Sequence, residues 1–216
     1  MKSVAVILAR GGSKGIPQKN IIPINNKPLL EYTITAAKQS NVNDVWVSTD
    51  CKNIKSVAIK LGVKVLDRPK NLASDYSKSE EALLHFSDKV SFDLLVFIQP
   101  TSPLILSNDI DVGLDMMTNQ IEKYDSVFSA YKEHWLPRWS EKKTPINWDT
   151  QNRPMRQDVD EVYVENGAFY ITTKAALHKS HLRYSGNIGI VEMPFSRSFQ
   201  IDTPDDLSLI KRLING

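Results

Sequence analysis

Residues 3–20 read SVAVILARGGSKGIPQKN, and this segment is the most informative part of the chain. Its first six residues are mostly apolar and β-branched, as in a parallel strand that is buried on both faces. A helical pattern follows at residues 29–40. The segment between them therefore lies at the carboxyl end of a strand, where open α/β sheets bind their ligands.

The loop after this strand combines glycine with positive charge. Glycine permits a positive φ and leaves backbone N–H groups free to face phosphate oxygens. The glycines of the loop are Gly11, Gly12 and Gly15, and its cations are Arg10, Lys14 and Lys19. The spacing is neither that of a Walker A motif nor G-x-G-x-x-G, so an ATPase and an NAD-dependent dehydrogenase are disfavoured. The loop predicts a polyphosphate site, because the alternative, a flexible basic loop with glycine at turn positions, does not account for three cations after the first strand.

Strand and helix patterns alternate along the chain, which predicts a single α/β domain over residues 1–216 with a Rossmann-like, mostly parallel sheet. Strands are expected at 3–8, 44–48, 63–66, 93–98 and 125–131. Helices are expected at 29–40, 51–61, 79–90 and 107–120, and a last helix is expected to begin at Pro204 after an N-capping Thr203. With 216 residues, of which 41% are hydrophobic and 24% charged, the chain can build one sizeable core.

Charge and cysteine content exclude several classes of protein. A net charge of +2 provides no broad basic surface, so we expect no nucleic acid partner. The single cysteine, Cys51, cannot form an intrachain disulfide. The first apolar run has no signal-type cleavage site and no window approaches a membrane span, so we expect a cytoplasmic protein with no membrane partner.

The alternation breaks between Lys132 and Asp160, where three of the four tryptophans are interspersed with prolines and charges. A long irregular excursion with exposed aromatic side chains is typical of a binding lid or a subunit interface. The alternative, that the tryptophans fold back onto their own domain, is equally compatible with the sequence.

Several motifs recur in the order found in one enzyme family. They are residues 8–20, Ser48-Thr49-Asp50, Arg68-Pro69, FIQPTSPL at 97–104, Arg156-Gln157-Asp158, ENGAFYI at 165–171 and IDTPDDL at 201–207. Over essentially the whole chain this pattern resembles the CMP-acylneuraminate synthetases, cytidylyltransferases that activate sialic acids and related 2-keto-3-deoxy sugar acids. The resemblance implies a sheet of the nucleotidyltransferase type, a protruding dimerisation segment at residues 132–160, and a homodimer whose subunits help to complete each other's sites.

The resemblance also implies the reaction. The anomeric hydroxyl of a free nine-carbon keto-sugar acid attacks the α-phosphate of CTP, pyrophosphate leaves, and a CMP-sugar forms with Mg²⁺ as the cofactor. Such a transfer needs alignment and charge neutralisation more than covalent help. The residues implied as catalytic are Arg10, Lys19 and Asp202. Those implied for nucleotide binding are Leu8, Ala9, Arg10, Gly11, Gly12, Ser13, Lys14, Asn20, Arg68 and Ser79.

The residues implied for the sugar acid come from later segments of the chain. They are Gln99, Thr101, Ser102, Arg156, Asn166, Ala168 and Phe169. Arg156 is the expected partner of the acid's carboxylate, because a guanidinium binds a carboxylate through two parallel hydrogen bonds. Alternatives stay open at two positions: Phe169 could equally be a core residue, and Arg68, taken without the family, would be a solvated charge before a proline.

Asp202 is the expected Mg²⁺ ligand, since Mg²⁺ in such sites takes one or two carboxylates together with phosphate oxygens and water. Many relatives carry Asp-Ile-Asp-Thr, whereas this chain has Gln200 at the first position. An amide oxygen can coordinate Mg²⁺ but cannot neutralise its charge, so Gln200 is considered as a second ligand and the number of ions stays open. The alternative role of Asp202 is helix capping beside Thr203.

Two other functions stay open. One is a nucleotidyltransferase with a phosphorylated acceptor, and the other is a catalytically weak nucleotide-binding regulator, for which Gln200 is the only hint in the sequence. The sequence does not specify which sugar acid is used. The segment QPTSP at residues 99–103 favours a nine-carbon acid, because synthetases for eight-carbon acids usually carry an acid-containing segment there.

Overall fold

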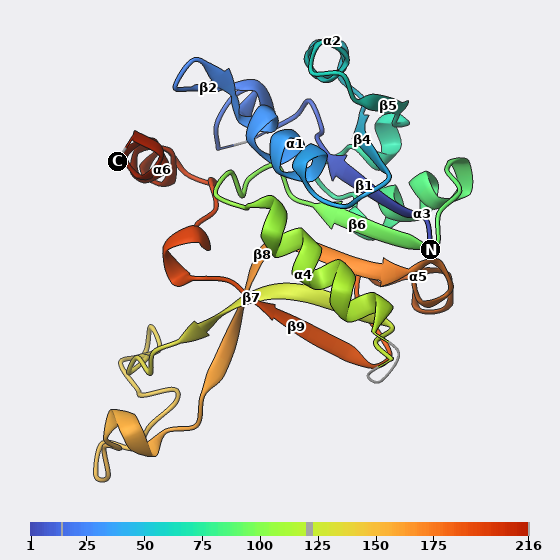
Figure 1. The fold of residues 1–216 in the computed structure, drawn as a ribbon. Helices are drawn as coiled ribbons and strands as arrows, with labels where there is room; N and C mark the ends of the chain where they lie inside the picture. Colours follow the sequence, from blue (N-terminus) through green and yellow to red (C-terminus); the bar gives the residue numbers. More distant parts are fainter. Residues whose placement is uncertain (14, 120–122, 216) are drawn as a thin grey trace.

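The sheet is built around β1 (Ser3–Leu8), the strand predicted from the first segment of the chain (Figure 1). Alternate side chains of β1 pack into two separate core clusters, one on each face of the sheet. A strand buried on both faces belongs in the middle of a sheet. Accordingly, β1 pairs in parallel with β4 (Asp44–Thr49) on one edge and β6 (Leu94–Ile98) on the other.

The computed structural model describes residues 1–13, 15–119 and 123–215. The remaining strands are β2 (Pro23–Ile24), β3 (Lys27–Pro28), β5 (Lys64–Asp67), β7 (Ser126–Glu133), β8 (Val162–Thr173) and β9 (Ile188–Glu192). The α-helices are α1 (Leu29–Gln39), α2 (Lys52–Lys60), α3 (Ser79–Lys89), α4 (Ser107–Thr118), α5 (Lys174–Ser180) and α6 (Pro204–Asn215). The short 3-10 turns are η1 (Lys19–Ile21), η2 (Lys70–Leu72), η3 (Arg156–Asp158) and η4 (Phe195–Arg197).

The seven strands of the main sheet are ordered β5-β4-β1-β6-β8-β7-β9. Neighbouring strands are parallel except around β8, which runs antiparallel to both β6 and β7. The predicted α/β fold with a mostly parallel sheet is confirmed, and the predicted strands and helices agree with the structure to within two residues. The hairpin of β2 and β3 was not predicted, because strands of two residues show no periodicity.

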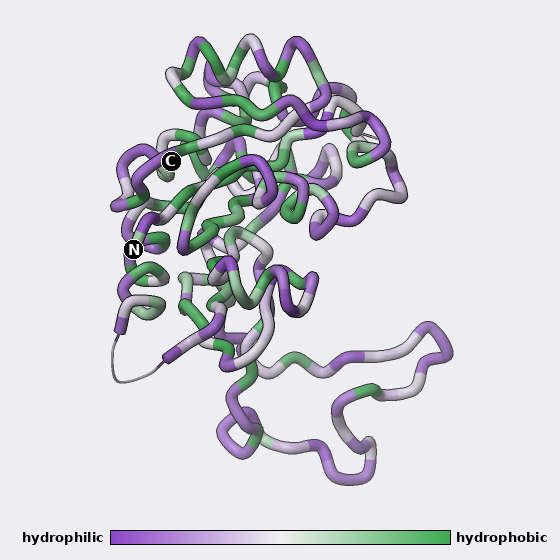
Figure 2. The backbone as a smooth tube through the Cα atoms, turned by 90° about the vertical axis from the view of Figure 1, so that its right-hand side faces the viewer, coloured by the Kyte–Doolittle hydropathy of each residue, from purple (hydrophilic) through white to green (hydrophobic). Residues whose placement is uncertain are grey.

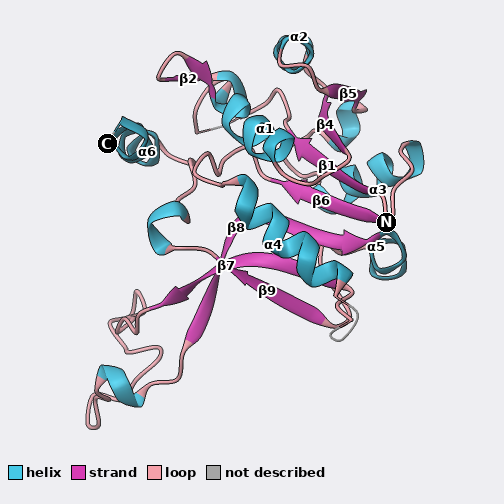
Figure 3. Ribbon diagram, viewed as in Figure 1, coloured by secondary structure: helices cyan, strands magenta, loops and turns pink. Residues whose placement is uncertain are grey.

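Helices cover both faces of the sheet (Figure 3). One face is packed by α1, α2 and α4, and the other by α3 and α5. The last helix, α6, packs with β2 and the start of α1 in a third apolar cluster. Over the described ranges, no helix has both the length and the apolar character needed to cross a membrane. Because β5, β4, β1 and β6 are parallel, the loops after them gather at one edge of the sheet.

The connection between β7 and β8, residues 134–161, extends away from the sheet as an excursion (Figures 1 and 2). Trp139 and Trp148 meet edge to face there, with ring centroids 5.2 Å apart. The guanidinium of Arg153 lies over the rings of Trp135 and Trp148 at 5.7 and 5.3 Å. These side chains form an aromatic cluster on the excursion itself, and the role of the excursion in dimerisation stays a prediction.

Replacing Gly113 of α4 with alanine is expected to destabilise the fold. A Cβ at this position would lie 2.8 Å from Cδ1 of Ile171 and 3.1 Å from Cε2 of Phe169, both of which are core residues. Overpacking costs about 1–3 kcal/mol, and we expect it to outweigh the gain in helix propensity of about 1 kcal/mol. The free energy of unfolding in urea measures the difference. Gly12→Ala is the control, because its Cβ would meet no atom within 4 Å. An unchanged or increased stability of Gly113→Ala would contradict the close packing of α4 on β8.

Candidate active site

A cavity of about 320 Å³ opens where β1, β5 and β6 end. Its lining comes from the first loop, η1, the end of β5, the start of α3, the loop after β6 and the loop before α6. The lining residues that the sequence predicted are Leu8, Arg10, Ser13, Lys19, Asn20, Arg68, Ser79, Gln99, Thr101 and Asp202. Ala9, Gly11 and Gly12 belong to the same first loop, and the predicted Lys14 lies outside the described residues.

Lys19 and Asp202 form an ion pair in this cavity, with Nζ and Oδ1 2.9 Å apart. The Lys19 ammonium also donates a hydrogen bond to the carbonyl of Ile201 at 2.9 Å. The side chain of Lys19 is 16% exposed and that of Asp202 is 65% exposed, so a largely buried cation lies beside an open carboxylate. The fold thus brings together two of the three residues predicted as catalytic.

The N-cap of α6 is formed by Thr203 together with Asp206. The hydroxyl of Thr203 accepts a hydrogen bond from the backbone N–H of Asp206 at 3.2 Å, which confirms the predicted N-cap. The carboxylate of Asp206 accepts hydrogen bonds from the backbone N–H groups of Thr203 at 2.7 Å and Asp202 at 3.0 Å, and these bonds lower its pKa. Capping therefore does not use the carboxylate of Asp202, so the capping alternative for that side chain is wrong.

Gly11 and Gly15 of the first loop allow close packing rather than a positive φ. None of Gly11, Gly12 and Gly15 has a positive φ, so that expectation is wrong. A Cβ at Gly15 would lie only 2.7 Å from the backbone oxygen of Asp202. The N–H of Gly11 donates to Oδ1 of Asp50 at 2.8 Å and is not free for a phosphate. Glycine is needed at position 15 because the first loop lies directly against the loop before α6.

Arg10 reaches across the cavity to the segment before α3. Its guanidinium donates to the carbonyl of Ser74 at 2.6 Å and pairs with Asp75 at 2.9 Å. The lining residues that the sequence analysis missed are Leu72, Ser74, Asp75, Ser77, Lys78 and Pro100. Most of them belong to the polar turn between β5 and the N-terminus of α3. Because loops that follow parallel strands form ligand sites in such sheets, this position along the chain could have identified them as lining residues.

Arg68 is a buried charge at the cavity, with 8% of its surface exposed. Its guanidinium donates to the hydroxyl of Ser48 at 3.2 Å and to the Ser48 carbonyl. Burial lowers the pKa of Arg68 to about 10, against the opposing effect of nearby Asp50. The side chain remains charged at neutral pH, and the alternative of a solvated surface arginine is wrong.

The loop after β6 contributes polar groups that lack partners. The hydroxyls of Thr101 and Ser102 are buried, and neither has a hydrogen-bond partner within the described part of the chain. A buried polar group left unpaired costs about 1–3 kcal/mol. Thr101 lines the cavity beside Gln99, whose backbone N–H is tied to the carbonyl of Ala168 at 3.0 Å. A bound molecule with hydrogen-bonding groups would satisfy the hydroxyl of Thr101.

The residues predicted on β8 belong to the interior. Phe169 and Ala168 lie in the hydrophobic core, with Phe169 fully buried, so the expectation that their side chains line a sugar pocket is corrected and the core alternative for Phe169 holds. Asn166 is also buried, and its carboxamide accepts a hydrogen bond from the Ser129 hydroxyl at 2.6 Å. Outward and inward positions cannot be assigned by alternation here, because the pairing of β7 with β8 shifts register.

Gln200 donates its side-chain amide to the backbone carbonyl of Asn166. Gly167, with a φ of 66°, leaves the space for it, since a Cβ there would collide with this amide. The arrangement turns Gln200 toward β8 and does not favour its predicted role as a metal ligand. Within the described ranges, no group of three or more His, Cys, Asp or Glu residues could hold a metal ion. The open carboxylate of Asp202 suits an ion that takes its other ligands from phosphate and water.

Arg156 lies apart from the cavity described above. It belongs to η3 on the excursion and lines a second cavity, of about 710 Å³, together with Trp135, Glu192 and Phe195. Within one chain, therefore, the structure does not bring Arg156 to the same cavity as the first loop.

Comparisons with known proteins relate the chain to a family and to solved structures. Residues 4–215 match the family described as Cytidylyltransferase. The chain is 38% identical to N-acylneuraminate cytidylyltransferase A of Danio rerio, over 94% of this chain and 48% of that protein, and so spans about half the length of that relative. It is 31% identical to the pseudaminic acid cytidylyltransferase of Campylobacter jejuni, over 99% of this chain and 96% of that one. A solved CMP:2-keto-3-deoxy-manno-octonic acid synthetase complexed with CTP has the same fold, with a TM-score of 0.77 at 20% identity over 100% of this chain and 99% of that one.

Replacing Gly15 with alanine is expected to weaken the binding of a nucleoside triphosphate. The new Cβ would lie 2.7 Å from the backbone oxygen of Asp202, so the first loop would have to shift, and with it the cations Arg10 and Lys19 that line the cavity. We expect affinity for CTP, measured by calorimetry, to fall about 10-fold or more, which corresponds to about 1.4 kcal/mol. Gly113→Ala is the matched control, because its Cβ would also meet a close contact, but with core side chains that do not line the cavity. Equal affinities of the two variants would show that the contact does not shape the site.

Proposed function

This chain belongs to the cytidylyltransferase family, and we propose that it transfers CMP from CTP to the anomeric hydroxyl of a free nine-carbon 2-keto-3-deoxy sugar acid, releasing pyrophosphate. The observation that carries the proposal is the convergence of Arg10, Lys19, Arg68 and Asp202 on one cavity at the carboxyl edge of the sheet. A triphosphate needs clustered cations, and the transfer of its α-phosphate needs those cations in fixed positions. The similarity to a pseudaminic acid cytidylyltransferase over nearly the whole of both chains supports a sugar acid as the acceptor.

In this mechanism, the side chains of the cavity bind the triphosphate and neutralise its charge. Arg10 and Lys19 stabilise the charge that develops on the transferring phosphate and the departing pyrophosphate. The loop after β6, with Gln99 and the unpartnered hydroxyl of Thr101, orients the acceptor. Arg68 helps to hold the nucleotide from the buried side of the cavity, where a charge in a low-dielectric setting acts more strongly than one in water.

We propose Mg²⁺ as the cofactor, with Asp202 as its protein ligand. The open carboxylate at the cavity supports this assignment. When bound, Mg²⁺ neutralises part of the triphosphate charge. Lys19, which donates to the carboxylate of Asp202 and to the carbonyl of Ile201, would also be placed to interact with a phosphate oxygen.

We further propose that the protein is a homodimer in which Arg156 completes the site of the partner subunit by binding the carboxylate of the sugar acid. The position of Arg156 outside its own phosphate cavity supports this assembly. So does the excursion, which carries exposed apolar side chains that a partner would cover. These side chains are Leu136, Trp139, Ile146 and Met155. A cytoplasmic location, where CTP is made, stays a prediction.

The reaction is tested by measuring pyrophosphate release with CTP and Mg²⁺ against a panel of free nine-carbon and eight-carbon keto-sugar acids and sugar phosphates. We expect release only with CTP and a free nine-carbon acid. Lys19→Met and Asp202→Asn should each lower kcat about 10²–10³-fold, as the loss of a charge-stabilising group usually does. Lys64→Met, which removes an exposed ion pair with Asp44 at the amino ends of β5 and β4, opposite the edge of the sheet that carries the cavity, should stay within about 2-fold of the parent.

Two outcomes would contradict the proposed reaction. Release that requires a phosphorylated acceptor would assign the chain to a different nucleotidyltransferase reaction. CTP binding without release, by a folded protein and with every acceptor of the panel, would favour a nucleotide-binding regulator.

Subunit complementation tests the shared site. Arg156→Ala and Lys19→Met should each be nearly inactive alone, because every site of either homodimer lacks one group. After unfolding and refolding together, half of the dimers are mixed and each has one intact site, so about a quarter of the parent activity should return. No recovery from the mixture, with dimers present by size-exclusion chromatography, would place Arg156 in the site of its own subunit or outside any site.

A further inference from the structure

The loop of residues 193–203 carries both groups that accept hydrogen bonds from Lys19, the carbonyl of Ile201 and the carboxylate of Asp202. The loop has no strand and only one short turn, η4. Near its end, the N–H of Ile201 donates to the carbonyl of Thr101 at 2.9 Å. Upstream of that bond, side chains from two other elements hold the loop in place.

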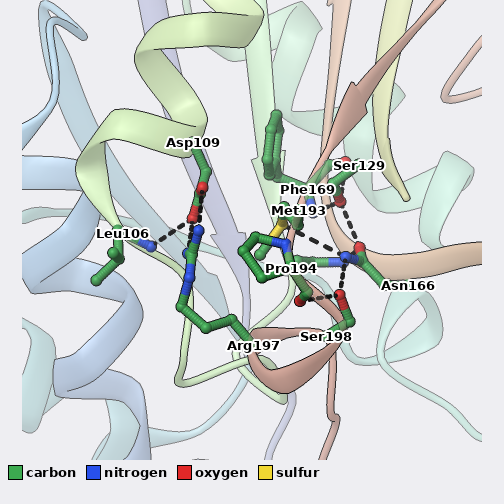
Figure 4. A network of polar contacts seen from close by, with 10 residues as sticks. Leu106, Asp109, Ser129, Asn166, Phe169, Met193, Pro194, Arg197 and Ser198 are labelled. Atoms are coloured by element: carbon green, nitrogen blue, oxygen red, sulfur yellow. Dashed lines mark hydrogen bonds and ion pairs between the residues drawn. The ribbon is translucent and has the colours of Figure 1, made fainter. Parts of the chain in front are cut away.

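An ion pair holds the middle of this loop against α4 (Figure 4). The guanidinium of Arg197 donates to both carboxylate oxygens of Asp109, with the Nη2–Oδ1 distance at 2.8 Å. Asp109 is 6% exposed and Arg197 25% exposed. The same carboxylate accepts a hydrogen bond from the backbone N–H of Leu106 at 2.9 Å. The pair therefore joins the loop to the N-terminus of α4 through a largely desolvated, bidentate contact.

Asn166 of β8 holds the same loop from the other side (Figure 4). Its amide nitrogen donates to the hydroxyl of Ser198 at 3.0 Å and lies 3.4 Å from the sulfur of Met193. Its backbone carbonyl accepts the amide of Gln200. Contacts at residues 193, 197, 198 and 200 thus hold the loop before it reaches Asp202. Among the described residues, the loop forms two ion pairs, Arg197 with Asp109 and Asp202 with Lys19.

We propose, resting on the function proposed above, that Arg197 and Asp109 are positioning residues that set the placement of Asp202. The helix that carries Asp109 begins directly after the loop that carries Gln99 and Thr101. The pair therefore fixes the loop of Asp202 relative to the loop on the acceptor side of the cavity. Arg197 and Asp109 do not line the cavity, so they act only through the loop that they hold.

Loss of Arg197 has a specific physical consequence. It leaves the Asp109 carboxylate in a buried setting without its counter-charge, and the loop relaxes to let water reach that group. Asp202 and Ile201 then lose their fixed position under Lys19. Residues that orient a metal ligand from behind typically change metal affinity about 10–100-fold when they are mutated.

The test compares Arg197→Met and Arg197→Lys with the parent protein. Hydrogen exchange of residues 198–203, measured by mass spectrometry without nucleotide, should be about 10-fold faster in Arg197→Met and intermediate in Arg197→Lys, which keeps the charge but not the bidentate contact. Binding of Mn²⁺ to the complex with CTP, followed by electron paramagnetic resonance without a sugar acid, should weaken about 10-fold or more. CTP affinity in EDTA should change less than about 2-fold, because the cations of the cavity lie on other elements.

Arg183→Met is the matched control. Arg183 pairs with Glu80 at 2.7 Å at similar burial but has no contact with the loop of residues 193–203 among the interactions described. We expect it to lower stability without changing exchange of residues 198–203 or Mn²⁺ affinity. Unchanged exchange in Arg197→Met, an equal increase in exchange over the whole chain, or the same effects in Arg183→Met would each overturn the proposal. If Arg197→Met fails to fold, the same measurements on Arg197→Lys and Asp109→Asn test the proposal: faster exchange of residues 198–203 and weaker Mn²⁺ binding are expected, and unchanged values would overturn it. The exchange experiment needs no turnover, so it stands even if the parent protein releases no pyrophosphate.

Discussion

The cavity depends on the contact between the first loop, which follows β1, and the loop of residues 193–203, which precedes α6. Lys19 and Asp202 meet there, but a partly exposed ion pair contributes only about 0–1 kcal/mol and cannot hold two loops together by itself. The support comes from the apolar cluster beside it, in which Ile16 of the first loop packs with buried Ile201 and Ile210. Hydrophobic burial fixes the distance between the loops, and the charges above it are free to exchange partners when a ligand enters.

The cations of the cavity differ in the partners that hold them. Arg68 is buried and already has Ser48 as its partner, so it is ordered before any ligand binds. Arg10 and Lys19 instead pair with the more exposed carboxylates of Asp75 and Asp202, whose side chains are 36% and 65% exposed. In the proposed function, these two ion pairs, rather than the contact of Arg68 with Ser48, are the ones that a triphosphate would replace. The proposed site is therefore preorganised at Arg68, and its exchangeable contacts are the two ion pairs.

The sequence predicted what depends on local pattern and missed what depends on packing between distant segments. β1, its loop and the cap at Thr203 are local features, and each was found where it was predicted. The function of Gly15 could not be found locally, because it depends on the backbone of a residue near the other end of the chain. For Phe169 the sequence left a sugar pocket and the core open, because the local pattern does not show the shifted pairing of β7 and β8, and the structure places the side chain in the core.

Gln200 is explained by the same packing. A carboxylate at this position could not donate a hydrogen bond to the carbonyl of Asn166, whereas the amide does. The space for that bond exists only because Gly167 has no side chain. A second carboxylate would also place another negative charge close to Asp202, without a described cation other than Lys19 in the immediate contact. In this chain, then, residue 200 anchors the loop to β8 in place of supplying charge, and of residues 200 and 202 only Asp202 presents a carboxylate to the cavity. An anchored loop with a single carboxylate can still serve a phosphate-bound Mg²⁺, since such ions take most of their ligands from phosphate and water.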